Sequence, residues 1–450
     1  MDKRHSWSSR LPTVAFLLLL LLFFLGTSLT SVNLRGGIIP DEGAHTMLTG
    51  EFAKTLGIPP ETEATIKRGV FIEGNPFLFY WLTARLRNLL TFFVPSATSK
   101  TLFYLDRFFN VFCSMANLVV VWLISCKVIK NVWLRLLPPF LLANILMFFF
   151  LSSGSNYDNL NNLLCSLSVL FAVGLVKGED FWRDTFRLFL VLALAGLTKK
   201  TAIPLIGILL IVWLAVLIYS KPKWHLPQGK NLVLLILALT AIAMNVFMYG
   251  RNLLVYKTLI PGCNQLATET QCSTSNFIVR EMTYALEEKM TIQEAVAEGY
   301  PDPVSYFFGY WSQVMVSRNI GVHGHKIYSN PLKTVVRFTL LGLVVAGLAF
   351  IRKPAKEVLL LGMIAVAYTL ILFVYNYDMQ LYYAFQGFAI QGRYIFPVIS
   401  CFLVLVAYLL ETLRPKALRI AAIIYVIILS IAAGPLQIFS FYQSFFTNWF

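Results

Sequence analysis

The stretch LPTVAFLLLLLLFFLGTSLTSV, residues 11–32, decides what kind of fold this chain has. It is predominantly apolar and carries no charged residue, and about 20 such residues in a helix cross the hydrocarbon core of a bilayer. The run is too long for the apolar core of an ordinary signal peptide and lacks a convincing small-residue cleavage site. We therefore interpret it as an uncleaved first membrane span.

Comparable apolar runs recur along the chain. Hydrophobic residues make up 58% of the 450 residues and charged residues 13%, whereas soluble domains carry about 25% charged residues. We predict an all-α polytopic membrane protein with about 11 transmembrane helices, not one large soluble helical domain. The predicted spans lie near 11–33, 103–126, 132–152, 159–176, 187–198, 202–219, 231–250, 332–351, 357–375, 394–411 and 418–438. The run 187–198 is short for a span, which predicts a tilted or broken helix.

The net charge of +15 reports membrane orientation and does not indicate nucleic-acid binding. The basic clusters fall in alternate short loops, as the positive-inside rule expects of cytoplasmic loops. One example is Lys221, Lys223 and Lys230, between the sixth and seventh predicted spans. The pattern places the N-terminus inside and makes anionic membrane lipids the expected partners of these loops. We expect no nucleic-acid partner.

The polar and acidic material gathers on the opposite, non-cytoplasmic face. Two large outer loops are predicted within a single transmembrane domain, residues 1–450: one over 34–102, with its own juxtamembrane helices, and one over 251–331. Within the first loop, FLFYWLTARLRNLLTFF predicts a helix lying in the membrane interface. Within the second, PGCNQLATETQC carries Cys263 and Cys272, which predict a disulfide in an oxidising compartment.

Three residues of the PDEGAH stretch are the first catalytic candidates. Asp41 and Glu42 are adjacent carboxylates just outside the first span, and His45 follows one helical turn after Asp41. A hydroxyl that attacks a sugar carbon needs a carboxylate to take its proton, so this pattern is typical of a general base with a supporting group. The alternative is an ordinary helix start, where acidic residues are common.

Asp158, Lys199 and Lys200 are further candidates at the outer ends of spans. Asp158, in SSGSNYDNLNN, suits a second acid or a metal ligand, or else a helix N-terminal charge. The lysine pair interrupts an apolar pattern on the outer side, where charges are expensive and by default functional. A lipid phosphate is a natural partner for it; the alternative is snorkelling to headgroups.

Arg393, Tyr394 and Arg251 also lie where spans meet the outer side. Arg393 and Tyr394 belong to QGRYIFP at the start of the tenth predicted span. An arginine here suits bidentate binding of a phosphate, and an interfacial aromatic belt is the alternative. Arg251 has the same two interpretations.

The second outer loop also contains VSYFFGYWSQVMVSRNIGVHGHK, whose aromatic residues suit stacking on sugar rings; the alternative is a loop that packs on the membrane surface. His323 and His325 within it suit a metal ion only weakly, because two ligands alone are little evidence. The cofactor therefore stays open, with a divalent metal as one possibility.

Taken together, these motifs resemble the GT-C superfamily of membrane glycosyltransferases, which includes the protein mannosyltransferases and the aminoarabinose transferase of lipid A. The shared features are PDE..H after the first span, NPFLFYW, an outer Asp after the third span, LTKKT, an aromatic GYW loop, and QGRY before a late span. The pattern is most similar to a bacterial branch with PDE..H and QGRY motifs. It covers most of the chain.

The resemblance implies an enzyme that moves a sugar from a polyprenyl-phosphate donor to a glycan or glycolipid acceptor. It implies a bacterial inner membrane, an active site facing the periplasm or exterior, and a role in cell-envelope polysaccharide such as O-antigen. Asp41 would be the catalytic base with Glu42 beside it, Asp158 the second acid, and Lys199 or Lys200 with Arg393 the lipid-phosphate contacts. No large soluble domain follows the last span, so the outer loops are expected to hold the acceptor.

Two other functions fit a polytopic chain with large outer loops. A transporter or flippase for a lipid-linked sugar predicts charges deep within several spans and a repeat symmetry. A polysaccharide polymerase or ligase relies on outer-loop arginines more than on an acidic pair after the first span. The position of Asp41 and Glu42 favours the transferase.

Overall fold

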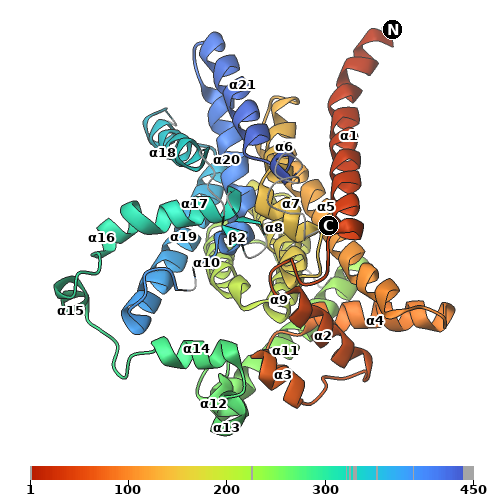
Figure 1. The fold of residues 1–450 in the computed structure, drawn as a ribbon. Helices are drawn as coiled ribbons and strands as arrows, with labels where there is room; N and C mark the ends of the chain where they lie inside the picture. The colour runs from red at the N-terminus through yellow and green to blue at the C-terminus, as the bar shows by residue number, and fades with distance from the viewer. Residues whose placement is uncertain are drawn as a thin grey trace.

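The computed structural model describes residues 3–438 except 224–226, 321, 324–325, 328–331, 351–352 and 389. Over these residues the chain is a bundle of helices with one small antiparallel hairpin, β1 (Val322–His323) paired with β2 (Lys326–Ile327) (Figure 1). The predicted all-α membrane class is thereby confirmed. His325 lies outside the described residues, so the structure does not place the predicted His323/His325 pair.

Within the described residues, eight helices are long and apolar enough to cross a membrane, and one bent pair brings the number to nine. The eight lie in α1 (Lys3–Asn33), α5 (Ser99–Val128), α8 (Tyr157–Lys177), η2 (Lys200–Ala202) with α10 (Ile203–Ser220), α11 (Lys230–Tyr256), α19 (Lys356–Tyr383), η4 (Gly392–Val398) with α20 (Ile399–Thr412), and α21 (Lys416–Ala432) with the residues that follow it to Ile438. The two other predicted spans, 187–198 and 332–351, coincide with α9 (Phe181–Thr198) and α18 (Leu332–Phe350).

The predicted span 132–152 is not one straight helix. It comprises η1 (Leu134–Leu136), α6 (Leu137–Ala143) and α7 (Leu146–Ser152), and the last two are bent by 66°. The break falls at Asn144, whose side-chain amide donates to the carbonyl of Phe140 (2.9 Å), and at Ile145, whose backbone is extended. Side-chain bonds of this kind compete with the helical ladder and end it.

The predicted short span 187–198 is instead a regular helix of 18 residues. It begins six residues before the predicted run, where the Asp180 carboxylate accepts a hydrogen bond from the Arg183 backbone N–H (3.2 Å). Asp180 is a favourable N-cap residue. Polar residues in the first two turns, including Asp184, hid this start from an apolar-run search.

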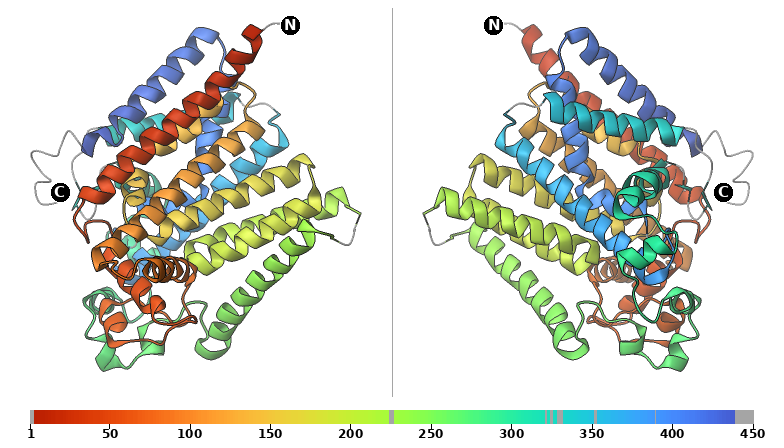
Figure 2. Two further views of the ribbon diagram at one scale, coloured as in Figure 1. Left: turned by 90° about the vertical axis from the view of Figure 1, so that its right-hand side faces the viewer. Right: turned by 90° about the vertical axis from the view of Figure 1, so that its left-hand side faces the viewer.

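The two outer loops are rich in short helices. The first holds α2 (Glu42–Ala53), α3 (Glu63–Arg68) and α4 (Leu78–Phe93). The second holds α12 (Cys263–Leu266), α13 (Glu269–Cys272), α14 (Asn276–Tyr284), α15 (Ile292–Ala297), α16 (Pro303–Ser305), the π-helical η3 (Tyr306–Trp311) and α17 (Ser312–Ile320). Helices α2, α3 and α12 to α14 lie together at the end of the bundle away from the N-terminus, hereafter the loop end (Figures 1 and 2).

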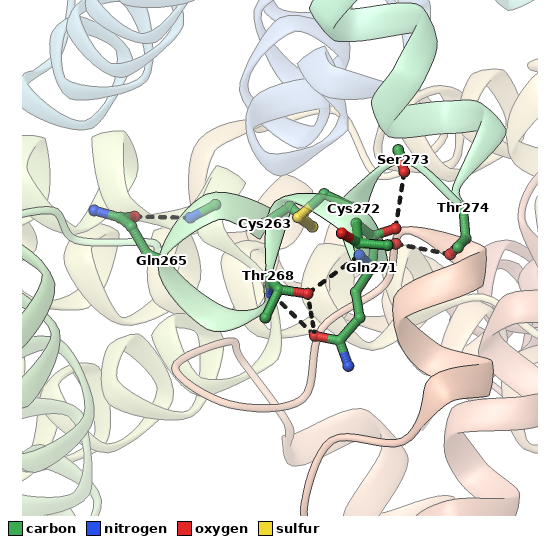
Figure 3. The surroundings of a disulfide bond; sticks show 9 residues. Cys263, Gln265, Thr268, Gln271, Cys272, Ser273 and Thr274 are labelled. Carbon is green, nitrogen blue, oxygen red and sulfur yellow. Dashed lines mark hydrogen bonds between the residues drawn. A yellow bond between two sulfur atoms is a disulfide. The ribbon is translucent and has the colours of Figure 1, made fainter.

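The two loops interlock at the loop end. Asn252, near the end of α11, donates from its side-chain amide to the carbonyl of Gly74 in the first loop (2.7 Å). A disulfide joins Cys263 to Cys272, with their Cα atoms 5.9 Å apart, and closes the short helices α12 and α13 into one unit (Figure 3). Phe71 of the first loop packs against this unit. The loops therefore form one support over the helix ends.

Helix α8 is the centre of the bundle. Most of its apolar length is buried, and it packs against α5, α9, α10 and α19. Its first turn lies at the loop end, where Asn156 caps it by accepting a hydrogen bond from the Asp158 backbone N–H (2.6 Å). The candidate span with the largest buried share in the described part of the chain thus presents Asp158 at the level of the predicted outer loops.

Candidate active site

Four charged side chains from distant parts of the sequence converge at the loop end. Asp41 precedes α2, Asp158 lies in the first turn of α8, Lys199 ends α9, and Arg393 lies in η4. The Arg393 Nη2 is 2.9 Å from Asp41 Oδ2, and its Nε is 3.6 Å from Asp158 Oδ2. The Lys199 ammonium pairs with the other Asp158 oxygen. Two cations and two carboxylates therefore form one cluster.

The members of this cluster differ in their access to solvent. The side chains of Asp158 and Lys199 are 5% exposed and that of Arg393 is 9% exposed, whereas that of Asp41 is 55% exposed. Within the described residues, Arg393 Nε and Nη1 and Asp158 Oδ2 are buried without a hydrogen-bond partner. Buried polar atoms of this kind call for a partner. The cluster thus has unused donors inside and an accessible carboxylate at its mouth.

The backbone of Asp41 is in the left-handed region, with φ 63°. Asp tolerates this conformation better than most residues, and such positions often accompany functional sites. Its side chain does not cap α2 and instead meets Arg393. Burial by itself would raise the pKa of the Asp41 carboxyl, but Arg393, with help from His45 and Lys199, lowers that pKa below its usual value. Asp41 is therefore a carboxylate at neutral pH.

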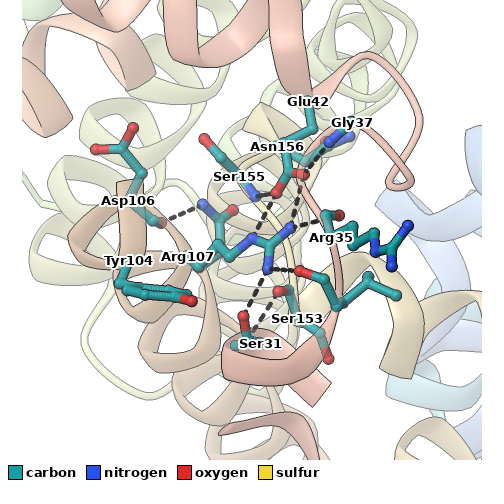
Figure 4. Close-up of polar contacts among 12 residues, drawn as sticks. Ser31, Arg35, Gly37, Glu42, Tyr104, Asp106, Arg107, Ser153, Ser155 and Asn156 are labelled. Atoms are coloured by element: carbon teal, nitrogen blue, oxygen red, sulfur yellow. Dashed lines mark hydrogen bonds and ion pairs between the residues drawn. The ribbon is translucent and has the colours of Figure 1, made fainter. Parts of the chain in front are cut away.

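Glu42 points into the protein toward Arg107 (Figure 4). Its Oε1 accepts from Arg107 Nε (2.8 Å) and the Ser155 backbone N–H (3.1 Å). Its Oε2 accepts from Arg107 Nη2 (2.8 Å) and the Gly37 backbone N–H (3.0 Å). Both side chains of the ion pair are fully buried. Asp41 and Glu42 are thus adjacent in the sequence but have separate surroundings. Each carboxylate oxygen of Glu42 already accepts two hydrogen bonds.

Arg107 also contacts the end of α1. We call the Glu42–Arg107 ion pair with its hydrogen bonds the latch. Its Nη1 donates to the carbonyls of Ser31 (2.5 Å), in the last turn of α1, and of Leu34 (2.7 Å), the residue after α1. Sequence reasoning missed Arg107, although the adjacent charges Asp106 and Arg107 inside an apolar run were a usable signal. The latch joins α1, α2 and α5.

His45 is buried, and its Nδ1 lies 2.9 Å from the Tyr80 hydroxyl of α4. Its ring packs edge-on against Tyr157, with centroids 4.4 Å apart. Burial lowers the pKa of His45 to about 4, although the carboxylates of Asp41 and Asp158 oppose that shift. The imidazole is therefore neutral at neutral pH, and it supports the cluster through packing.

Two tyrosine rings flank the Lys199 ammonium. The Tyr157 centroid is 4.4 Å and the Tyr394 centroid 5.2 Å from Nζ, which is cation–π range. Burial lowers the pKa of Lys199 to about 8, with the opposing effect of Asp158 second. Lys200 is exposed, and only Lys199 of the two contacts Asp158. The structure thus separates the two adjacent lysines.

Arg251 lies apart from the cluster. Its Nη2 pairs with Glu73 Oε1 at 2.5 Å, both side chains are 41% exposed, and its guanidinium lies 5.7 Å from the Tyr256 ring. These contacts tie α11 to the first outer loop. The structure therefore brings Asp41, Asp158, Lys199, Arg393, Tyr394 and His45 together and leaves Arg251 at the surface.

Two glycines of the motifs allow the close approach of the elements that build the site. A Cβ at Gly154, just before α8, would lie 2.4 Å from the Ile39 side chain. A Cβ at Gly392, beside Arg393, would lie 2.8 Å from the carbonyl oxygen of Met315 in α17. Any side chain at either position would push these segments apart.

Among the described residues, no group of three or more His, Cys, Asp and Glu side chains is placed to hold a metal ion. In the cluster itself, the carboxylates of Asp41 and Asp158 are matched by Arg393 and Lys199. Arg393 keeps buried N–H groups without a hydrogen-bond partner, and such donors suit an anion.

Comparison with solved structures finds chains whose fold aligns with most of this one. ArnT from Cupriavidus metallidurans, bound to undecaprenyl phosphate, aligns with a TM-score of 0.50 and 14% identity over 90% of this chain and 61% of its own. The apo oligosaccharyltransferase of Archaeoglobus fulgidus aligns with a TM-score of 0.46 and 12% identity over 96% of this chain and 58% of its own.

The fold is therefore GT-C-like, as the motifs predicted, and the likeness to ArnT at this identity concerns the fold. The chain spans 61% of the length of the ArnT chain. No protein-family model matches the sequence, and no curated protein sequence matches it.

Proposed function

We propose that this protein is a GT-C-type glycosyltransferase that moves a sugar from a polyprenyl-phosphate donor to an acceptor hydroxyl at the loop end. The observation that carries the proposal is the buried pair Lys199 and Arg393, with unused donors on Arg393, beside the half-exposed carboxylate of Asp41. A solved structure of ArnT, which shares the fold, is bound to undecaprenyl phosphate; this supports a polyprenyl phosphate as the ligand here.

The spacing of the two cations suits one phosphoryl group. Lys199 and Arg393 face the two oxygens of the single carboxylate of Asp158. Two oxygens of one phosphoryl group have a similar separation, and an arginine binds them in the bidentate manner it uses with carboxylates. The contacts with Asp158 therefore show that both cationic side chains can reach one group of this size.

The reaction follows from this placement. The acceptor hydroxyl oxygen attacks the anomeric carbon of the sugar, and the bond from that carbon to the phosphate oxygen breaks. The polyprenyl phosphate leaves with the bonding electrons, and Lys199 and Arg393 stabilise its added negative charge. The hydroxyl proton passes to the carboxylate of Asp41, whose lowered pKa keeps it ionised at neutral pH. Glu42 holds the start of α2 and takes no proton.

The ion pair between Arg393 and Asp41 implies an order of substrate binding. Without donor, Arg393 Nη2 occupies an Asp41 oxygen at 2.9 Å. A phosphate that binds Arg393 competes for that guanidinium and frees the Asp41 oxygen for the acceptor hydroxyl. The donor is therefore expected to bind before the acceptor becomes reactive.

The orientation and the pathway belong to the same proposal. The basic loops at the other end of the spans favour a cytoplasmic position for that end, which puts the loop end on the periplasmic or exterior side of a bacterial inner membrane. The products are then glycans or glycolipids of the cell envelope, such as O-antigen.

Binding of undecaprenyl phosphate to the purified protein in nanodiscs tests the proposal. The wild type should bind it saturably, and Lys199→Met should weaken binding by at least about tenfold, the cost of one lost charge-assisted contact. Lys200→Met is the matched control, one residue away and exposed, and should bind within about twofold of the wild type. Equal affinity of the two lysine variants, or no binding by the wild type, would refute the proposed site.

A further inference from the structure

The two cations of the site lie beside or within short turns. Lys199 lies between α9 and the three-residue turn η2, and Arg393 lies in the seven-residue turn η4. A 3₁₀ turn has poorer hydrogen-bond geometry than an α-helix and is used in short connections. The internal bonds of neither turn set the distance between Lys199 and Arg393, so another element must do so.

A tyrosine of a third helix bridges the two turns. Tyr368 lies in α19, where its side chain is 2% exposed. Its hydroxyl donates to the carbonyl of Thr201 (2.9 Å), two residues after Lys199, and is also within hydrogen-bond distance of the carbonyl of Tyr394 (3.1 Å), the neighbour of Arg393. One phenol group thus contacts the backbone of both cation-bearing turns.

Its helix makes Tyr368 a firm anchor. Helix α19 has 28 residues, and its face around Tyr368 is buried through Ile364 and Ala365. The phenol has few rotatable bonds and is packed on all sides, so the position of its hydroxyl follows that of the helix. As a result, the contacts with this hydroxyl fix the separation of the Thr201 and Tyr394 carbonyls.

We propose that Tyr368 is a positioning residue for donor binding: its hydroxyl sets the separation of Lys199 and Arg393. The inference rests on the proposed function, because the ligand that binds both cations is the phosphate of the polyprenyl donor. Tyr368 does not contact the phosphate itself in this arrangement. Its loss should therefore affect the affinity for the donor more than the rate of transfer from bound donor.

The test uses Tyr368→Phe, which removes one hydroxyl and keeps the ring. Tyr377→Phe is the matched control, since Tyr377 lies on the same helix and its hydroxyl also donates to a backbone carbonyl, that of Pro301 (3.2 Å). We expect Tyr368→Phe to weaken binding of undecaprenyl phosphate by about five- to tenfold, the scale of one buried hydrogen bond. Tyr377→Phe should remain within about twofold of the wild type. In turnover, the donor KM should rise while kcat falls less than about twofold.

A rescue variant separates positioning from general stability. p-Aminophenylalanine at position 368 keeps an N–H donor near the two carbonyls and should restore affinity to within about twofold of the wild type. It also serves if the phenylalanine variant does not fold. Equal binding by the wild type and Tyr368→Phe, equal losses in Tyr368→Phe and Tyr377→Phe, or failure of the rescue would overturn the inference. Absence of binding by the wild type would instead refute the proposed function.

Discussion

The latch between Glu42 and Arg107 should be worth several kcal/mol, and Glu42→Gln measures it. Each Glu42 oxygen accepts two N–H groups, one of them from Arg107. In the glutamine variant, one of the two oxygens is replaced by an NH₂ group, which donates and cannot accept. The two N–H groups that faced that oxygen lose their acceptor, and the buried Arg107 loses its counter-charge. Breaking a fully buried ion pair from one side costs about 3–5 kcal/mol.

This cost translates into a thermal shift. An unfolding entropy of about 2.1 cal/mol/K per residue gives roughly 1 kcal/mol per degree for a chain of this length. The unfolding midpoint of Glu42→Gln in detergent should thus fall by about 3–5 °C. The transfer rate should fall as well, because the latch holds the start of α2 and with it Asp41.

The matched control is Glu73→Gln in the same outer loop. Glu73 also pairs with an arginine, Arg251, but both side chains are 41% exposed, and exposed pairs contribute about 0–1 kcal/mol. Its midpoint should fall by no more than about 1 °C. Equal midpoints for the two glutamine variants, measured by fluorescence-detected unfolding, would refute the reasoning about the buried latch.

Three further predictions concern the site and its support. Because Arg393 lowers the pKa of Asp41 in the free enzyme, kcat/KM, which reports the free enzyme, should hold on acidification to about pH 5; half-loss near pH 6 would contradict the assignment of the base. Donor affinity should decrease as the pH rises through about 8, where Lys199 loses its proton, and a flat titration to pH 9 would contradict its role. Mass spectrometry of unreduced peptides should find Cys263 linked to Cys272, and two free thiols would contradict the disulfide.

The sequence was a good guide to elements with a strong apolar or amphipathic pattern. FLFYWLTARLRNLLTFF, residues 77–93, predicted a helix, and α4 is Leu78–Phe93. The broken span at Asn144 and the early start of α9 at Phe181 were not predictable from apolar runs. In both cases, hydrogen bonds of single polar side chains decided where a helix begins or ends.

The site residues could be proposed singly but not assembled. Asp41, Asp158, Lys199 and Arg393 each interrupted an apolar or helix-start pattern, and such charges at membrane depth stand out. Their convergence joins positions up to 352 residues apart, which no local pattern encodes. The same limit hid Arg107, whose partner Glu42 lies 65 residues away.

The central claim is that Asp41 accepts the proton in a sugar transfer from a polyprenyl phosphate. The most direct measurement is a mass-spectrometric comparison of surface glycans and lipid-linked sugars from cells with the wild-type protein, Asp41→Asn protein or no protein, with membrane levels of the variant checked in parallel. The account predicts that one sugar mass disappears equally in the variant and the deletion, while the polyprenyl-linked sugar accumulates. Glycans from the Asp41→Asn cells that match those of the wild type would contradict it.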